Sequence, residues 1–179
     1  FHSPGISILL RPFYALGSLF GGKLQLFIIR MGMSLFGALF GFQVYLFARQ
    51  EWSREKTALG LWAVFSFTSP IFFHALHIYP EIIVTFFSLL IFRWLRFSRK
   101  LSRFQLLAIG FMLSLFVWLH AVKYTLILIP FFLYCLWEMI KKHRTGWGIG
   151  YFFFFPFVLG FLHILFSHNL YVSFSPFVV

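Results

Sequence analysis

The sequence predicts an all-α protein: a polytopic bundle of about six transmembrane helices, preceded by one helix that lies in the membrane interface. Three observations predict this fold class. Of the 179 residues, 61% are hydrophobic and only 11% are charged, whereas an ordinary soluble domain has about 25% charged residues. The apolar residues form long runs separated by short polar segments, and the basic residues are concentrated in alternate segments. Because so few polar residues cannot form a water-exposed surface, the chain is expected to be an integral membrane protein.

Residues 1–23 are expected to form the end of an outer loop and then an interfacial helix. The apolar run 6–20 is interrupted by Arg11 and Pro12 and is followed by Gly21. At about 1.5 Å per residue this run reaches about 22 Å, which is shorter than the roughly 30 Å hydrocarbon core of a bilayer. The run is therefore predicted to lie along the membrane surface and not to cross it.

Six longer apolar runs follow, and each is expected to cross the membrane as a helix. They are residues 24–48, 57–73, 80–92, 104–118, 124–140 and 148–167. Residues 168–179 are expected to begin another outer loop, so the whole chain is interpreted as a single transmembrane domain. In the first span, Gly37 and Gly41 form a G-x-x-x-G pair, which lets another helix approach closely. Packing within the same chain is the favoured interpretation, and dimerisation is the alternative.

The basic residues predict the orientation of the bundle. The segments 49–56, 93–103 and 141–144 hold three, five and three Lys or Arg residues, which is eleven of the fifteen in the chain. Cytoplasmic loops generally carry this excess, so these segments are expected to be cytoplasmic, in a bacterial inner membrane. The turns 74–81 and 118–124 then face the non-cytoplasmic side. Orientation in the bilayer explains the net charge of +11, and no nucleic-acid partner is expected.

The first outward turn carries two histidines and a glutamate. Glu81 is the only acidic residue expected on that side. A carboxylate in the first turn of a helix is stabilised by the helix dipole, so this structural role and a role in orienting a sugar hydroxyl or a basic partner both stay open. His74 and His77 are three residues apart and could share a helix face. Two histidines without a third ligand do not indicate a metal site, so no cofactor and no divalent metal ion is expected.

The second outward turn contains His120, Lys123 and Tyr124. Lysine binds phosphate as a point charge, and Lys123 is expected at the depth of a lipid phosphate. The alternative is that it extends to the headgroup layer only because its charge must stay in water. Arg30 lies about a third of the way along the first span. An arginine at the centre of a span costs roughly 2.5–3.5 kcal/mol, so Arg30 is expected to face protein or a water-filled cavity, or to extend to the interface.

His163 lies within the sixth span and is interpreted as a packed, hydrogen-bonded residue. The sequence contains no glycine-rich phosphate loop, nucleophile elbow or zinc signature. The chemistry of the chain is therefore not contained in one local motif, and it has to come from residues that the fold brings together.

Several short segments occur in an order that resembles one known group of proteins. In chain order they are His2-Ser3-Pro4-Gly5, Leu19-Phe20-Gly21, Arg30, Leu35-Phe36-Gly37 and Tyr45-Leu46-Phe47-Ala48-Arg49. They resemble the polytopic glycosyltransferases of the GT-C superfamily that use lipid-phosphate sugars, such as the protein mannosyltransferases and the lipid A aminoarabinose transferases. In that group an H-P-P-L-like motif leads into an interfacial helix, and a transmembrane helix with an early arginine follows. Ser3-Pro4-Gly5 replaces the double proline. The two outward turns resemble those of bacterial members.

The resemblance implies inverting transfer of a sugar from a polyprenyl-phosphate donor to an acceptor on the non-cytoplasmic face. It also implies an acidic residue early in the first outer loop, but the chain has no aspartate and no glutamate before Glu51. The catalytic residue is therefore expected upstream of Phe1, in a longer protein of which this chain is an internal piece that is inactive alone. The resemblance implies that Lys123 and Arg30 are the cations that bind the donor phosphate. It implies that His2 and His120 donate hydrogen bonds, and that Glu81 is a partner of the sugar or of a cation. Secondary candidates are His74, His77 and Tyr124.

Two other classes of function stay open. A transporter or flippase domain could carry the same outward polar cluster without covalent chemistry. A tandem repeat of the bundle would favour that class, whereas an acidic outer loop before Phe1 would favour the transferase. A membrane-embedded scaffold without a ligand would require the outward polar residues to be dispersed in space.

Overall fold

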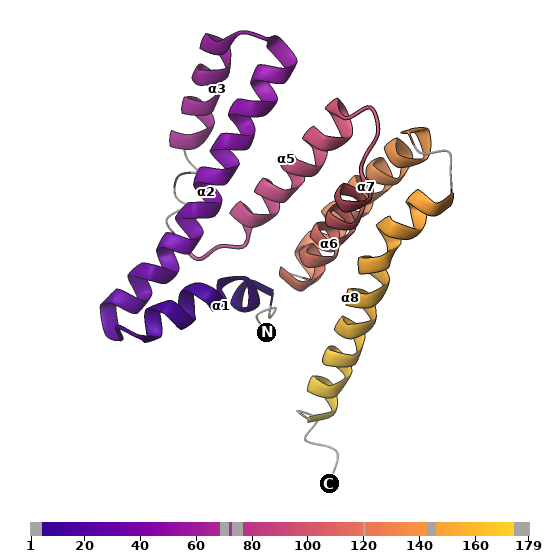
Figure 1. The fold of residues 1–179 in the computed structure, drawn as a ribbon. Helices are drawn as coiled ribbons and strands as arrows, with labels where there is room; N and C mark the ends of the chain where they lie inside the picture. Colours follow the sequence, from indigo (N-terminus) through magenta and orange to yellow (C-terminus); the bar gives the residue numbers. More distant parts are fainter. Residues whose placement is uncertain (1–4, 69–71, 73–76, 120, 143–145, 174–179) are drawn as a thin grey trace. The chain divides into compact units, whose positions relative to one another are not determined.

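The computed structural model describes residues 5–68, 72, 77–119, 121–142 and 146–173. In these residues the chain forms helices and no strands, which confirms the all-α class for the part that is described (Figure 1). The helices are α1 (Gly5–Ser18), α2 (Gly22–Trp52), α3 (Glu55–Phe67), α5 (Glu81–Phe97), α6 (Arg103–Leu119), α7 (Ala121–Lys142) and α8 (Gly146–Ser173).

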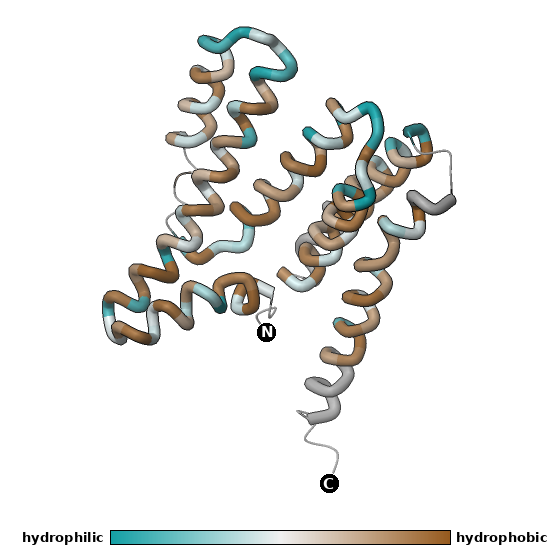
Figure 2. Tube along the Cα trace, viewed as in Figure 1, coloured by the Kyte–Doolittle hydropathy of each residue, from teal (hydrophilic) through white to brown (hydrophobic). Residues whose placement is uncertain are grey.

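Two of the described helices are long and apolar enough to cross a membrane. They are α2 and the stretch Ile149–Phe166 of α8. The helix Arg103–Leu119 is apolar but shorter. Figure 2 shows hydrophobic residues along most of α2, α6 and α8, and hydrophilic residues at the turn between α2 and α3 and after α5. That six helices cross the membrane stays a prediction.

All the helices from α5 onward, and α2, extend beyond the apolar runs that predicted them. In the second half of the chain α8 extends furthest: it continues to Ser173, so residues 168–173 are helical and not the start of an outer loop.

Two helices in the first half extend at their C-terminal ends. The run 24–48 lies within α2, which continues to Trp52. The next residue, Ser53, is the C-cap, and its φ of 52° puts the backbone in the left-handed region. Likewise, α5 continues past the expected end at residue 92 to Phe97. Both extensions contain polar as well as apolar residues. The helices can continue through them because a helix needs its backbone hydrogen bonds and does not need an apolar surface.

The other two boundaries in the first half of the chain also differ from the expectation. The interfacial helix was expected over residues 6–20, whereas α1 begins at Gly5, continues through Arg11 and Pro12, and ends at Ser18. The second expected span reaches residue 73, whereas α3 ends at Phe67 because Thr68 has an extended backbone (φ −91°, ψ 147°).

The chain divides into two compact units, which are unit 1 (Phe1–Ser98) and unit 2 (Arg99–Val179). Unit 1 contains α1, α2, α3 and α5, and unit 2 contains α6, α7 and α8. The expected single transmembrane domain stays a prediction, and each unit is described by itself.

In unit 1, α2 is the helix against which α1, α3 and α5 pack. Gly21 and Gly22 have φ values of 68° and 53° and reverse the chain between α1 and α2. A side chain at Gly32 would lie 2.7 Å from the ring of Phe13, so the glycine lets α1 lie close to α2. A side chain at Gly41 would lie 2.5 Å from Ser66 Oγ of α3. Gly41 of the predicted G-x-x-x-G pair therefore faces a helix of its own chain.

Aromatic rings join α2 to α5 along one face. The Phe36 ring lies 6.1 Å from that of Phe86, and the Phe47 ring lies 5.8 Å from that of Phe92 and 5.6 Å from that of Phe97. Pairs at such distances stabilise a contact by about 0.5–1.5 kcal/mol beyond the area they bury. The α2–α5 contact is thus continuous over most of the length of α5.

In unit 2, α6 packs along α8. Pro156 lies inside α8, and because proline has no N–H, it leaves the carbonyl four residues earlier, that of Phe152, without its usual helical donor. Gly110 of α6 packs directly against this carbonyl. The Phe152 side chain is fully buried and lies 5.2 Å from the Phe132 ring of α7. The indole N–H of Trp118 donates a hydrogen bond to the carbonyl of Leu159, at 3.2 Å.

Candidate functional site

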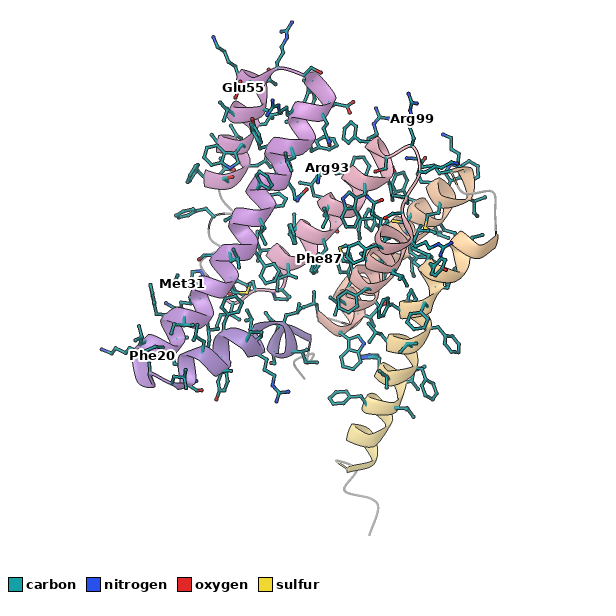
Figure 3. All side chains as sticks on the ribbon, in the orientation of Figure 1. Phe20, Met31, Glu55, Phe87, Arg93 and Arg99 are labelled. Carbon is teal, nitrogen blue, oxygen red and sulfur yellow. The ribbon has the colours of Figure 1, made fainter. Side chains whose placement is uncertain are left out.

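One end of unit 1 is polar and cationic. Arg96 of α5 forms an ion pair with Glu51 of α2, with 3.2 Å between Nη2 and Oε1. Arg93 Nη1 donates a hydrogen bond to Gln50 Oε1 at 3.4 Å. These contacts bring together two of the segments that were predicted to be cytoplasmic. Figure 3 shows Glu55 and Arg93 toward this end and Phe20 and Met31 toward the other.

A pocket of about 380 Å³ lies at the other end of unit 1. We call it the α1 pocket, and its lining residues are Ile6, Ser7, Leu10, Arg11 and Tyr14 of α1, Ile29 of α2, and Ile78 of the turn before α5. Glu51 follows Ile29 by 22 residues along α2, a distance of about 33 Å at about 1.5 Å per residue. The α1 pocket and the cationic end are therefore separated by about the thickness of a hydrocarbon core, roughly 30 Å.

The polar residues of the α1 pocket lie on one stripe of α1. Ser7, Arg11 and Tyr14 are spaced by four and three residues, which puts them on the same helix face. The Arg11 side chain is exposed and, within the described part of the chain, forms no hydrogen bond or ion pair. None of the described residues that line the pocket is acidic, and the other lining side chains are Ile or Leu. A cation and two hydroxyls thus stand beside an apolar surface.

Sequence reasoning did not find this pocket. It treated Arg11 as an interruption of an apolar run, although the spacing of Ser7, Arg11 and Tyr14 already placed a polar stripe on the expected interfacial helix. The apolar wall could not be deduced, because Ile78 lies more than sixty residues further along the chain and reaches α1 only through the fold.

Three of the predicted site residues are described in unit 1. Arg30 follows Ile29 on α2 and is exposed, but it does not line the α1 pocket. His77 is exposed in the turn before α5, and its ring lies 6.0 Å from that of Tyr79. Glu81 is half-buried in the first turn of α5, after Pro80 at the N-cap, and its carbonyl accepts a hydrogen bond from Thr85 Oγ1 at 2.7 Å. The position of Glu81 fits the helix-dipole interpretation of its carboxylate, and its role toward a sugar or a cation stays a prediction.

The other predicted site residues lie partly outside the description. His2, His74 and His120 are not among the described residues. Lys123 and Tyr124 lie near the start of α7 in unit 2, and only their backbone is described. Convergence of these residues with the candidates in unit 1 therefore stays a prediction.

Unit 2 contains a smaller cavity of about 110 Å³, between α6, α7 and α8. Its polar residues are Ser114, Trp118 and His163, and the rest of the lining is apolar. The His163 ring packs 5.4 Å from that of Trp118, and its buried Nδ1 has no hydrogen-bond partner among the described residues. Packing of His163 was expected, but the expected hydrogen bond is not found at Nδ1.

In the described ranges, no group of three or more His, Cys, Asp or Glu side chains is placed to hold a metal ion. Comparison of the chain with protein-family models, with curated proteins and with solved structures found no match. The likeness to the glycosyltransferases rests on the short segments given above. Function therefore has to be argued from the two ends of unit 1.

Proposed function

We propose that this chain belongs to an integral membrane glycosyltransferase, which transfers a sugar from a polyprenyl-phosphate donor to an acceptor on the non-cytoplasmic face. The observation that carries the membrane placement is the separation of two polar ends in unit 1, and sugar transfer is proposed from the resemblance of the short segments named above. Glu51 and Arg96 pair at one end, and the α1 pocket, which contains Arg11, lies at the other. A bilayer between the two ends accounts for the apolar length of α2 that separates them.

The charge of the two ends supports the orientation. The Glu51–Arg96 end holds two of the three segments in which Lys and Arg are concentrated, which favours the cytoplasmic side. The α1 pocket and the turn with His77 and Glu81 then face the opposite side. Helix α1 has exposed apolar residues such as Ile8 and Leu16 next to its polar stripe, as in a helix that lies in the interface. We further propose that the remaining helices cross the bilayer to give the six-span bundle, in a bacterial inner membrane.

In the proposed reaction, the acceptor hydroxyl oxygen attacks the anomeric carbon of the donor sugar. A new bond between this carbon and the acceptor oxygen forms, the bond from the carbon to the phosphate oxygen breaks, and polyprenyl phosphate leaves with the bonding pair. A carboxylate takes the hydroxyl proton as general base. Positive side chains near the leaving phosphate stabilise its developing charge. Lys123 and Arg30 are proposed for this role, with His2 and His120 as hydrogen-bond donors and Glu81 as the partner of the sugar or of a cation.

The general base that the resemblance implies is an early acidic residue, and residues 1–50 contain no Asp or Glu. The proposal for this chain therefore concerns the residues that bind the donor, and its test uses the full-length protein. No divalent metal is part of the proposed reaction, because the charge of the leaving phosphate is assigned to the side chains of Lys123 and Arg30.

The test is a transfer assay in proteoliposomes. The full-length protein is incubated with polyprenyl-phosphate sugars that carry a radiolabelled sugar, with and without a membrane fraction that supplies acceptors. The proposal predicts release of unlabelled polyprenyl phosphate and labelled product only when acceptors are present. Movement of an intact labelled donor across the bilayer, with its sugar–phosphate bond unbroken, would contradict it and support the transporter alternative.

A further inference from the structure

We propose that the α1 pocket binds the phosphate group of an anionic lipid, with Arg11 as the residue that holds the charge. The lipid chains then lie against the apolar wall that Ile29 and Ile78 form. The inference rests on the membrane placement of the proposed function, but it does not depend on sugar transfer. It adds a lipid site to unit 1 at residues that differ from the donor-phosphate candidates Arg30 and Lys123.

The polar side of the pocket fits a phosphate. Among the described lining residues Arg11 is the one cation, and none of them is acidic. Its guanidinium is exposed and unpaired within the described residues, so its fork of N–H donors is available for a bidentate contact with phosphate oxygens. The hydroxyls of Ser7 and Tyr14 lie on the same stripe of α1 and can donate two further hydrogen bonds.

The apolar side fits a lipid better than a soluble anion. Four of the seven lining residues are Ile or Leu, and they come from α1, α2 and the turn before α5. A soluble phosphate gains nothing from such a wall, whereas a lipid covers it with the first part of its chains, at about 25 cal/mol per Å² buried. The volume of about 380 Å³ lies within the range of about 300–1,000 Å³ that is usual for small-molecule sites.

The position of α1 fits the depth of a lipid headgroup. Near the end of α1 and in the turn that follows it, Leu16, Leu19 and Phe20 are 52%, 76% and 60% exposed. Such a surface is stable when it lies in the interfacial layer of a bilayer, where lipid phosphates are found. The Arg11 side chain would then lie at the same depth in the bilayer as the lipid phosphates.

The experiment measures lipid binding by native mass spectrometry of the full-length protein in a neutral detergent. Phosphatidylglycerol is added at increasing concentration, and phosphatidylcholine is added in a parallel series. Arg11→Ala should weaken phosphatidylglycerol binding about tenfold or more, because a hydrogen-bonded charge pair is lost, and Arg11→Lys should recover part of it. Tyr14→Phe should weaken binding a few-fold, since it removes one neutral donor. Phosphatidylcholine, which has no net charge, should bind more weakly to the wild type.

Lys23→Ala is the matched control, because Lys23 is an exposed cation at the start of α2 that does not line the pocket. It should leave phosphatidylglycerol binding unchanged. Equal binding by the wild type and Arg11→Ala, or an equal loss in Lys23→Ala, would overturn the proposal. Displacement of the lipid by inorganic phosphate at equal concentration would also overturn it, by showing a site for a soluble anion. Because no sugar is present, loss of the glycosyltransferase proposal would not alter this result.

Discussion

The backbone of Gly110 on α6 packs directly against the carbonyl oxygen of Phe152 on α8, and a side chain at Gly110 would collide with that oxygen. The Cδ atom of Pro156 is also near, 3.2 Å from where a Cβ of residue 110 would lie. Pro156 leaves the Phe152 carbonyl without its helical donor. The backbone of Gly110 lies beside this carbonyl oxygen. At this contact the backbones of α6 and α8 lie too close together for a side chain at position 110.

Gly110→Ala is therefore expected to destabilise unit 2. Its added methyl group meets a backbone atom, which cannot move without shifting α8, and overpacking of this kind costs about 1–3 kcal/mol. Gly150→Ala is the control on α8, because no atom lies within 4 Å of its Cβ position. Thermal unfolding in detergent, followed by circular dichroism, should show a lower midpoint for Gly110→Ala alone. Equal midpoints for the two variants would show that the α6–α8 contact is looser than described.

Replacement of Gly41 tests whether the G-x-x-x-G pair packs within the chain. A side chain at Gly41 meets Ser66 Oγ at 2.5 Å and the Trp62 indole at 3.2 Å, both on α3 of the same unit. Gly41→Leu should lower the thermal midpoint without changing the oligomeric state, whereas Gly60→Leu on α3, with no atom within 4 Å of its Cβ position, should change neither. Light scattering coupled to size-exclusion chromatography gives the oligomeric state. A shift from dimer to monomer in Gly41→Leu would instead show that the pair serves dimerisation.

Helices could be predicted from the sequence because long apolar runs favour helices over other secondary structures. An apolar run shows which residues lipid or protein covers, but it does not show at which residue the helix ends. The apolar run ends at residue 48, for example, whereas α2 continues to Trp52 and is followed by Ser53 in the left-handed conformation. The Gly110–Phe152 contact could not be predicted, because it joins residues 42 positions apart through the geometry of two helices.

The candidate site was predictable only where a single turn determines it. Glu81 was expected in the first turn of a helix, and the structure places it there. The α1 pocket was missed because its wall depends on Ile78, which only the tertiary fold brings to α1. The expected convergence of Arg30 with Lys123 depends on contacts between residues far apart in sequence, which no local pattern specifies.

Lys123→Ala is expected to weaken binding of the polyprenyl-phosphate donor, because the proposed site loses a point charge at the leaving phosphate. The loss should appear as a raised KM for the donor and a lowered kcat in the proteoliposome assay, since the charge on the phosphate grows during the reaction. Lys100→Ala, in a segment predicted to be cytoplasmic, is the control and should transfer sugar like the wild type. Unchanged transfer by Lys123→Ala would remove this residue from the site.

The central claim is that the two ends of unit 1 lie on opposite sides of a membrane, and cysteine labelling in intact cells tests it most directly. In a Cys135→Ser background, single cysteines replace Tyr79, which is 49% exposed in the turn before α5, and Arg54, which is exposed between α2 and α3. A membrane-impermeant maleimide added outside should label Tyr79→Cys at once and Arg54→Cys only after the membrane is permeabilised. Labelling of both from outside, or the reverse order, would contradict the account.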